Sequence, residues 1–142
     1  MAKLIDSVAL FYGLSQAELG ELLANSDKRT FPGNTVILSE GSEGNFMYIL
    51  VEGEVAIVKG KSQILAKLAS GDCFGEMALV DSLSRCASVV STVPCVLIRV
   101  SENAFSQKPA ISAKLYRNIA RQLSSRLRDS NAMISLGLKD HP

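Results

Sequence analysis

Phe74-Gly75-Glu76-Met77-Ala78-Leu79 is the most informative segment of this 142-residue chain, and Arg85 follows its glutamate nine positions later. The segment places a carboxylate and a permanently charged guanidinium at the two ends of one short connection. A guanidinium matches two oxygens of a phosphate, and a glycine lets the backbone approach a ligand closely. Amides at the start of a short helix after Gly75 would also face an anion. This combination predicts a small-molecule sensor rather than a catalyst.

Each of these residues also has an ordinary structural interpretation. Glu76, taken alone, is better explained as a surface glutamate or as an acceptor for the amides of its own helix start. Arg85, taken alone, is better explained as a solvated arginine or one paired with a carboxylate. The spacing of the two residues favours the binding site.

Composition limits the classes of function. Hydrophobic residues make up 47% of the chain and charged residues 20%, which is typical of one globular domain. The formal net charge of +1 gives no overall attraction to nucleic acid. No stretch approaches the roughly 20 apolar residues of a membrane helix, and Asp6 interrupts the N-terminus before any signal-like run. We expect a cytoplasmic protein that binds neither nucleic acid nor membrane.

The cysteines and the histidine argue against a metal site. Cys73, Cys86 and Cys95 form no CxxC pair, and His141 is the single histidine. We therefore expect three reduced and mostly buried thiols, no metal and no cofactor. A reactive thiol at Cys86 beside Arg85 is the less favoured alternative.

Helices are expected at both ends of the chain. Ser15 and Glu18 have the spacing of a capping box, and Leu19, Leu22 and Leu23 follow at helical spacing. Towards the C-terminus, Ser101 can cap a short helix and Pro109 suits the start of a longer one. That longer helix has one apolar face, Ile111, Leu115, Ile119, Leu123 and Leu127, with Arg117, Arg121, Arg126 and Arg128 interspersed.

Short β-rich runs between glycines and prolines predict an all-β sandwich or roll in the middle of the chain. Tight hairpin turns are expected at Glu52-Gly53-Glu54 and at Lys59-Gly60-Lys61. The expected divisions of this single domain are helical residues 1–28, a roll over 29–100, C-terminal helices over 101–134 and a tail over 135–142. The predicted strands lie within 35–38, 47–51, 55–58, 64–68, 87–90 and 95–100.

The segment from Phe74 to Leu79, with Arg85 and Ala87, resembles the phosphate-binding cassette of cyclic nucleotide-binding domains. That family includes bacterial catabolite activator proteins, protein kinase A regulatory subunits and cyclic nucleotide-gated channels. Residues 31–37 resemble its early strand with a glycine turn, and residues 47–55 resemble its central hairpin with Gly53 at the turn. The resemblance covers most of the chain.

The resemblance implies an eight-stranded jelly-roll-like β-roll flanked by an N-terminal helix and C-terminal helices. Glu76 would accept a hydrogen bond from the ribose 2′-hydroxyl, and Arg85 would pair with the cyclic phosphate. The other ligand-contacting residues would be Phe74, Gly75, Met77, Ala78, Cys86 and Ala87. Many relatives have threonine, serine or alanine where Cys86 stands, and a hydroxyl there favours cyclic GMP. Cysteine is a weak donor, so cyclic AMP is the favoured ligand.

In the family the long C-terminal helix closes over the base, which makes Ser125, Arg126 and Leu127 candidate base contacts here. The favoured alternative is core packing for the leucine and solvent for Arg126, and the same apolar stripe could instead pair two subunits in a homodimer. Family transcription factors carry a helix-turn-helix domain after this helix, whereas this sequence ends at Pro142. Two interpretations stay open, a stand-alone sensor and one domain of a larger protein.

The sequence thus predicts a non-enzymatic sensor for a cyclic nucleotide, with an unidentified downstream effector protein. A protein-interaction module with an empty or vestigial pocket is one alternative, and cyclic GMP as the ligand is another. A small enzyme is disfavoured because His141 stands alone and a cation near Glu76 suits binding more than proton transfer.

Overall fold

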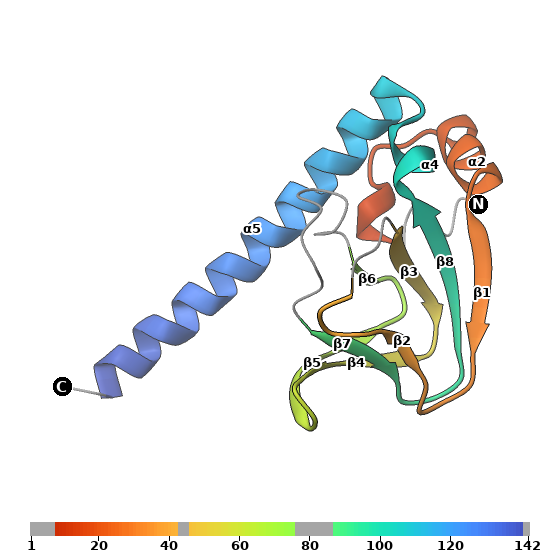
Figure 1. Cartoon of the computed structure of the whole chain (residues 1–142). Coiled ribbons are helices and arrows are strands. Elements are labelled where there is room, and N and C mark those ends of the chain that lie inside the picture. Colours follow the sequence, from red (N-terminus) through yellow and green to blue (C-terminus); the bar gives the residue numbers. More distant parts are fainter. Residues whose placement is uncertain (1–7, 43–45, 76–86, 141–142) are drawn as a thin grey trace.

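The computed structural model describes residues 8–42, 46–75 and 87–140. These residues form eight strands in two four-stranded antiparallel sheets, with orders β1-β8-β3-β6 and β2-β7-β4-β5. Figure 1 shows the two sheets facing each other as a roll, with the helices gathered at one end. The predicted roll is confirmed. The strands are β1 (Asp27–Phe31), β2 (Val36–Leu38), β3 (Phe46–Glu52), β4 (Glu54–Lys59), β5 (Gln63–Ala69), β6 (Cys73–Phe74), β7 (Ser88–Ser91) and β8 (Cys95–Ser101).

Two strands, β1 and β6, were not predicted from the β-rich runs of the sequence. The first, β1, reads Asp-Lys-Arg-Thr-Phe and is almost entirely exposed at the edge of its sheet, where β8 is its partner. The other, β6, has two residues and pairs with β3, with Tyr48 opposite Phe74. An exposed edge strand has no buried face to impose alternation, and two residues are too few to show a period.

Gly53 does not form a hairpin turn, and this corrects the sequence-based prediction. β3 pairs with β8 and β6, whereas β4 pairs with β5 and β7, so Gly53 carries the chain from one sheet to the other. Its φ is +111°, and a Cβ there would lie 2.6 Å from Cys95 Sγ and 2.7 Å from the carbonyl oxygen of Pro94. Both the backbone conformation and the lack of space require glycine at this corner.

The turn at Gly60 is a hairpin, as predicted. It joins β4 to β5 in antiparallel pairing, and Gly60 has a φ of +63°. The residues of β5 are mostly exposed because this strand lies at the edge of its sheet.

The helices are η1 (Ala9–Phe11), α2 (Gln16–Ala24), α4 (Glu102–Ser106) and α5 (Pro109–Asp140). α2, α4 and α5 begin where Ser15, Ser101 and Pro109 predict a helix start, whereas η1 has no side-chain cap. Ser15 and Glu18 form the predicted capping box, with bonds of 3.1 and 2.9 Å. Ser101 Oγ accepts a hydrogen bond from the amide of Ala104 at the start of α4. No helix in the described ranges combines the length and apolarity needed to cross a bilayer.

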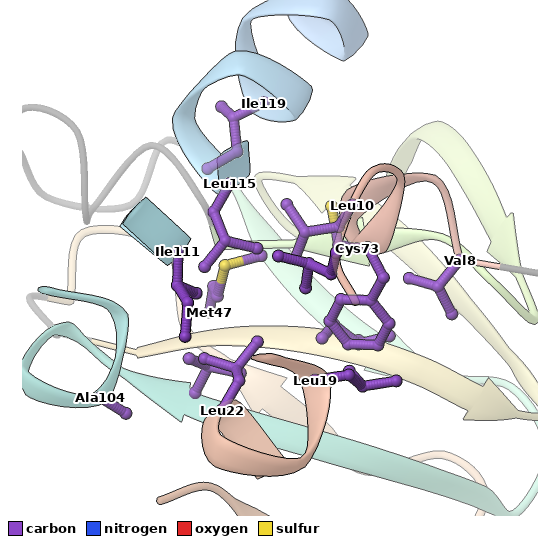
Figure 2. Packing of buried hydrophobic residues seen from close by; sticks show 14 residues of the cluster. Val8, Leu10, Leu19, Leu22, Met47, Cys73, Ala104, Ile111, Leu115 and Ile119 are labelled. Atoms are coloured by element: carbon purple, nitrogen blue, oxygen red, sulfur yellow. The ribbon is translucent and has the colours of Figure 1, made fainter. Parts of the chain in front are cut away.

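Two hydrophobic clusters lie on opposite faces of β3, because successive side chains of a strand point to opposite sides. Met47 and Ile49 face the helices, and Figure 2 shows Leu115 and Ile111 of α5 approaching Met47, with Leu10 of η1 beside them. Tyr48 and Leu50 face the other sheet, inside the roll. The inner cluster contains Leu38, Tyr48, Leu50, Val55, Phe74, Val89, Cys95 and Leu97.

α5 begins at the predicted proline and continues to Asp140, into the stretch predicted to be a tail. Gly137 does not end it, which is consistent with the cost of an internal helical glycine, only about 1 kcal/mol. Figure 1 shows α5 running from its contact with η1 past the roll to an end well separated from both sheets. Ile111, Leu115 and Ile119 are buried, but Leu127 is 62% exposed, so the packed part of the apolar face ends earlier than predicted.

Candidate functional site

Glu76, Met77, Ala78, Arg85 and Cys86 lie outside the described residues. Their roles as ligand contacts therefore stay predictions. The structure does describe Gly75 and Ala87, the residues on either side of the segment 76–86. Gly75 follows a strand of one sheet, and Ala87 precedes a strand of the other.

The N-terminal end of this segment is anchored inside the roll. Phe74 is 3% exposed and its ring stacks on Tyr48, with ring centroids 5.3 Å apart and an angle of 12° between the planes. Gly75 follows with a φ of +82°, a conformation that glycine adopts without strain. The stacked pair holds β6 in place, and the glycine turns the chain out of the sheet.

The C-terminal end of the segment enters the opposite sheet. Ala87 is half-buried, and β7 then pairs with both β4 and β2. Ser88 Oγ accepts a hydrogen bond of 2.8 Å from the amide of Glu40, and Glu40 Oε1 accepts one of 3.0 Å from the amide of Gly60. These bonds connect the end of the segment to the β4–β5 turn.

A side-chain hydrogen bond connects the start of the segment to α5. Cys73 Sγ donates to Gln122 Oε1 over 3.0 Å, and Cys73 is 1% exposed. Cys73 immediately precedes Phe74, so β6 is in direct contact with the middle of α5. The sequence-based prediction overlooked Gln122, and the available signal was a polar residue between Ile119 and Leu123 in an otherwise apolar face.

A second polar residue of α5, Asn118, holds η1. Its Nδ2 donates to the carbonyl oxygens of Leu10 and Tyr12, at 2.6 and 2.8 Å, and the side chain is 4% exposed. The guanidinium of Arg121 lies over the Tyr12 ring, 5.6 Å from its centroid. The sequence-based prediction also overlooked Asn118. The available signal was again a polar residue within an apolar helix face, here between Leu115 and Ile119.

Two ionic contacts join α2 to α5 and to the residue that precedes it. Lys114 Nζ lies 2.6 Å from Glu18 Oε1, and Lys108 Nζ lies 2.8 Å from Glu21 Oε1. The hydrogen bond from Lys114, followed by that from the Ser15 amide, lowers the pKa of Glu18 below its ordinary value. Glu18 therefore serves both as a cap for α2 and as a partner for α5.

The predicted base contacts lie beyond the packed part of α5. Ser125 is exposed and lines a cavity of about 340 Å³ together with Tyr12 and Gln122. Leu127 is exposed, and the Arg126 side chain lies outside the described atoms. Contact of these three residues with a base stays a prediction.

A family model and a related sequence both match this chain to cyclic nucleotide-binding proteins. A family model described as a cyclic nucleotide-binding domain matches residues 28–110, which is more than half of the chain. A cAMP-dependent protein kinase regulatory subunit from Hypocrea atroviridis is 32% identical over 103 residues, covering 72% of this chain and 22% of that protein.

Solved structures agree with the sequence match. The Thermus thermophilus catabolite activator protein superposes with a TM-score of 0.79 at 27% identity, covering 90% of this chain and 62% of that one. The regulatory domain of Toxoplasma gondii PKA with cAMP superposes with a TM-score of 0.68 at 26% identity, covering 74% of this chain and 41% of that one. The chain therefore spans less than two thirds of the length of each of these relatives.

Proposed function

This chain belongs to the family of cyclic nucleotide-binding domains, and we propose that it is a regulatory module that binds cAMP in preference to cGMP without acting as an enzyme. The observation that carries this proposal is the way the roll holds the segment with Glu76 and Arg85. Gly75 leaves one sheet and Ala87 enters the other, so both ends of the segment are fixed by buried strands. The relatives whose names include cAMP support the choice of ligand class.

In the proposed complex, Glu76 accepts a hydrogen bond from the ribose 2′-hydroxyl and Arg85 pairs with the cyclic phosphate. Gly75, Met77 and Ala78 contribute backbone groups. The stacking of Phe74 on Tyr48 fixes the backbone that leads into the site, and a binding site needs such packed residues to hold its contacts in position.

The preference for cAMP rests on Cys86. Its side chain has no hydroxyl that could bond the guanine amino group, and a thiol is a weak hydrogen-bonding group. Cys86→Thr is expected to raise the affinity for cGMP relative to cAMP, and titration of both nucleotides with the variant measures that ratio.

We assign the response to α5. The hydrogen bond between Cys73 and Gln122 joins this helix to the strand that precedes the nucleotide segment, so movement there reaches α5 directly. Ser125, Arg126 and Leu127 are the proposed contacts to the base, and the exposed Leu127 also suits a homodimer through α5. The output passes to an effector protein, without direct contact to nucleic acid or membrane. The reduced Cys73 and Cys95 are consistent with the cytoplasm.

Isothermal titration with cAMP and cGMP tests the proposal. Arg85→Ala is expected to weaken cAMP binding by about 2–5 kcal/mol, the usual loss when one partner of a buried charge pair is removed. Arg29→Ala is the matched control, because Arg29 lies exposed on the edge strand β1, and its affinity should equal that of the wild type.

Two results would contradict the proposal. Equal cAMP affinity in the wild type and Arg85→Ala would remove the assigned phosphate contact. If millimolar cAMP and cGMP neither bind nor shift the melting temperature of the wild-type protein, the pocket is vestigial and the chain is a protein-interaction module.

A further inference from the structure

The first 20 residues of α5, Pro109 to Arg128, carry an unusual local charge. From Pro109 to Arg128 the sequence contains no aspartate or glutamate, although the whole chain has a formal net charge of only +1. A charge concentrated on one helix of a nearly neutral protein attracts partners to that helix rather than to the whole surface. The cations in this stretch are Lys114, Arg117, Arg121, Arg126 and Arg128.

Three of these cations lie on one side of α5 and face a groove. Lys114, Arg117 and Arg121 are spaced by three and four residues, which aligns them along one helix face. With Tyr12 and Asn118 they line a cavity of about 200 Å³ between α5 and the turn after η1. The groove thus has a row of cations along one wall.

The groove continues along α5 into a second, larger cavity. The cavity of about 340 Å³ shares Tyr12, Asn118 and Arg121 with the first and adds Ala9, Gln122 and Ser125. Tyr12 is 65% exposed, and Ala9 is also exposed, so apolar surface is accessible beside the cations. The shared residues join the two cavities into one surface, here called the Tyr12 groove.

Among the described residues, the two guanidinium groups of the Tyr12 groove form no ion pair. Lys114 is held by Glu18, and the neighbouring carboxylate Glu21 is held by Lys108. Within the described residues no carboxylate lies within 4.0 Å of Arg117 or Arg121. Arg121 lies over the Tyr12 ring, which orients its guanidinium and leaves its hydrogen-bond donors unused by any acid.

We propose that the Tyr12 groove binds an acidic amphipathic helix of a partner protein. Carboxylates at helical spacing would pair with Arg117 and Arg121, and an apolar side chain would fill the larger cavity beside Tyr12 and Ala9. The cations of the groove and the exposed apolar surface of Ala9 and Tyr12 both match such a segment. This inference goes beyond nucleotide binding and does not depend on it.

The dimensions of the groove favour a protein segment over other polyanions. A short concave surface accepts individual side chains, whereas a duplex presents phosphates over a broad convex surface. A protein with strongly salt-dependent DNA binding makes roughly 6–10 phosphate contacts, more than the three cations of the groove can supply. The apolar surface of Ala9 and Tyr12 would also be left unused by phosphates.

Fluorescence anisotropy with two synthetic peptides tests the inference. The first peptide is a helix with glutamates three and four residues apart on one face and leucines on the adjacent face; the second has the same composition in scrambled order. The full chain without nucleotide should bind the first peptide about fivefold to twentyfold more tightly, since each of the two exposed ion pairs contributes up to about a factor of five.

Variants of equal charge locate the binding. Arg117→Gln combined with Arg121→Gln should weaken binding of the patterned peptide by about fivefold to twentyfold. Lys28→Gln combined with Lys61→Gln removes the same charge from exposed positions on β1 and on the β4–β5 turn, and should change binding by less than about twofold. Arg117→Gln alone changes one exposed side chain and leaves the contact between Arg121 and Tyr12 in place, so it should lose affinity without affecting folding. Circular dichroism checks the folding of each protein.

Three outcomes would overturn the inference. The patterned peptide could fail to bind at millimolar concentration, or bind no better than the scrambled one. The lysine control could lose as much affinity as the arginine variant, which would reduce the effect to net charge. Finally, phosphatidylserine vesicles or a DNA duplex could bind more tightly than the peptide with the same dependence on Arg117 and Arg121, which would assign the groove to a lipid or a nucleic acid.

Discussion

Replacing Asn118 with alanine is expected to lower the free energy of unfolding by about 2–4 kcal/mol. The side chain donates to two backbone carbonyls, and both bonds are short, 2.6 Å to Leu10 and 2.8 Å to Tyr12. The carbonyl of Leu10 is buried and would be left without a donor, at a cost of about 1–3 kcal/mol. The carbonyl of Tyr12 lies nearer the solvent and can bind water, so its loss is about 0.5–1.5 kcal/mol.

Urea denaturation at 25 °C, with tertiary and secondary structure followed separately, measures this loss. Asn25→Ala is the matched control, because its Nδ2 also donates to a backbone carbonyl, that of Glu21 at 3.0 Å, but in an exposed position. We expect that control to cost less than about 1 kcal/mol. In Asn118→Ala, amide hydrogen exchange in η1 should become faster than in the wild type, whereas exchange in β8 should change less. The reason is that the lost hydrogen bonds hold η1 and not β8.

Asn118→Asp separates hydrogen bonding from packing. The carboxylate keeps the shape of the amide but has no donor and would face two carbonyl oxygens, so this variant should be less stable than Asn118→Ala at neutral pH. The role assigned to Asn118 is wrong if Asn118→Ala costs no more than Asn25→Ala, or if exchange in η1 is unchanged.

Three further changes test the packing and the ionic contacts. Gly53→Ala should cost about 2–4 kcal/mol in chemical denaturation, because the corner requires a positive φ and has no room for a Cβ; Gly60→Ala, at a positive φ in open space, should cost only about 1–2 kcal/mol, and equal costs would refute the steric reasoning. Leu115→Ala should cost about 2–5 kcal/mol, since this fully buried side chain joins α5 to the sheet, and a loss below 1 kcal/mol would show that α5 is not packed there. Glu18→Gln should destabilise the protein at pH 7, and this loss should shrink in acid: the lowered pKa of Glu18 means that the contact with Lys114 contributes above the unfolded-state pKa and is lost as the pH falls through the folded-state pKa. The melting temperatures of the wild type and Glu18→Gln should therefore converge as the pH falls below 7, and a constant difference would contradict the ionic explanation.

Local signals in the sequence were sufficient for the helix starts and for most strands. Ser15, Ser101 and Pro109 each act through a neighbouring turn of backbone, so their effects can be inferred without knowing the fold. The prediction for Gly53 was wrong because a glycine between two β-rich runs looks the same in a hairpin and at a corner between sheets. Only the pairing partners of β3 and β4 distinguish the two.

The candidate site was predictable to a different extent. Glu76 and Arg85 were identified by their spacing and by a family resemblance, and their contacts stay predictions. Asn118 and Gln122 were not identified, because their importance depends on which carbonyl or thiol lies opposite α5 in the folded protein. Leu127 continues the apolar periodicity of α5 but is exposed, since periodicity cannot show where a helix leaves the body of the protein.

The length of α5 makes it a lever. Among the α5 side chains that the structure describes, the buried apolar ones, Ile111, Leu115 and Ile119, lie in the first part of its 32 residues. At 1.5 Å per residue the helix is about 48 Å long, so a tilt of about 10° at its base would move its far end by about 8 Å. Gln122 lies about 20 Å from the start of the helix, so a shift of about 1 Å where it meets Cys73 would become a displacement of about 2.4 Å at the far end.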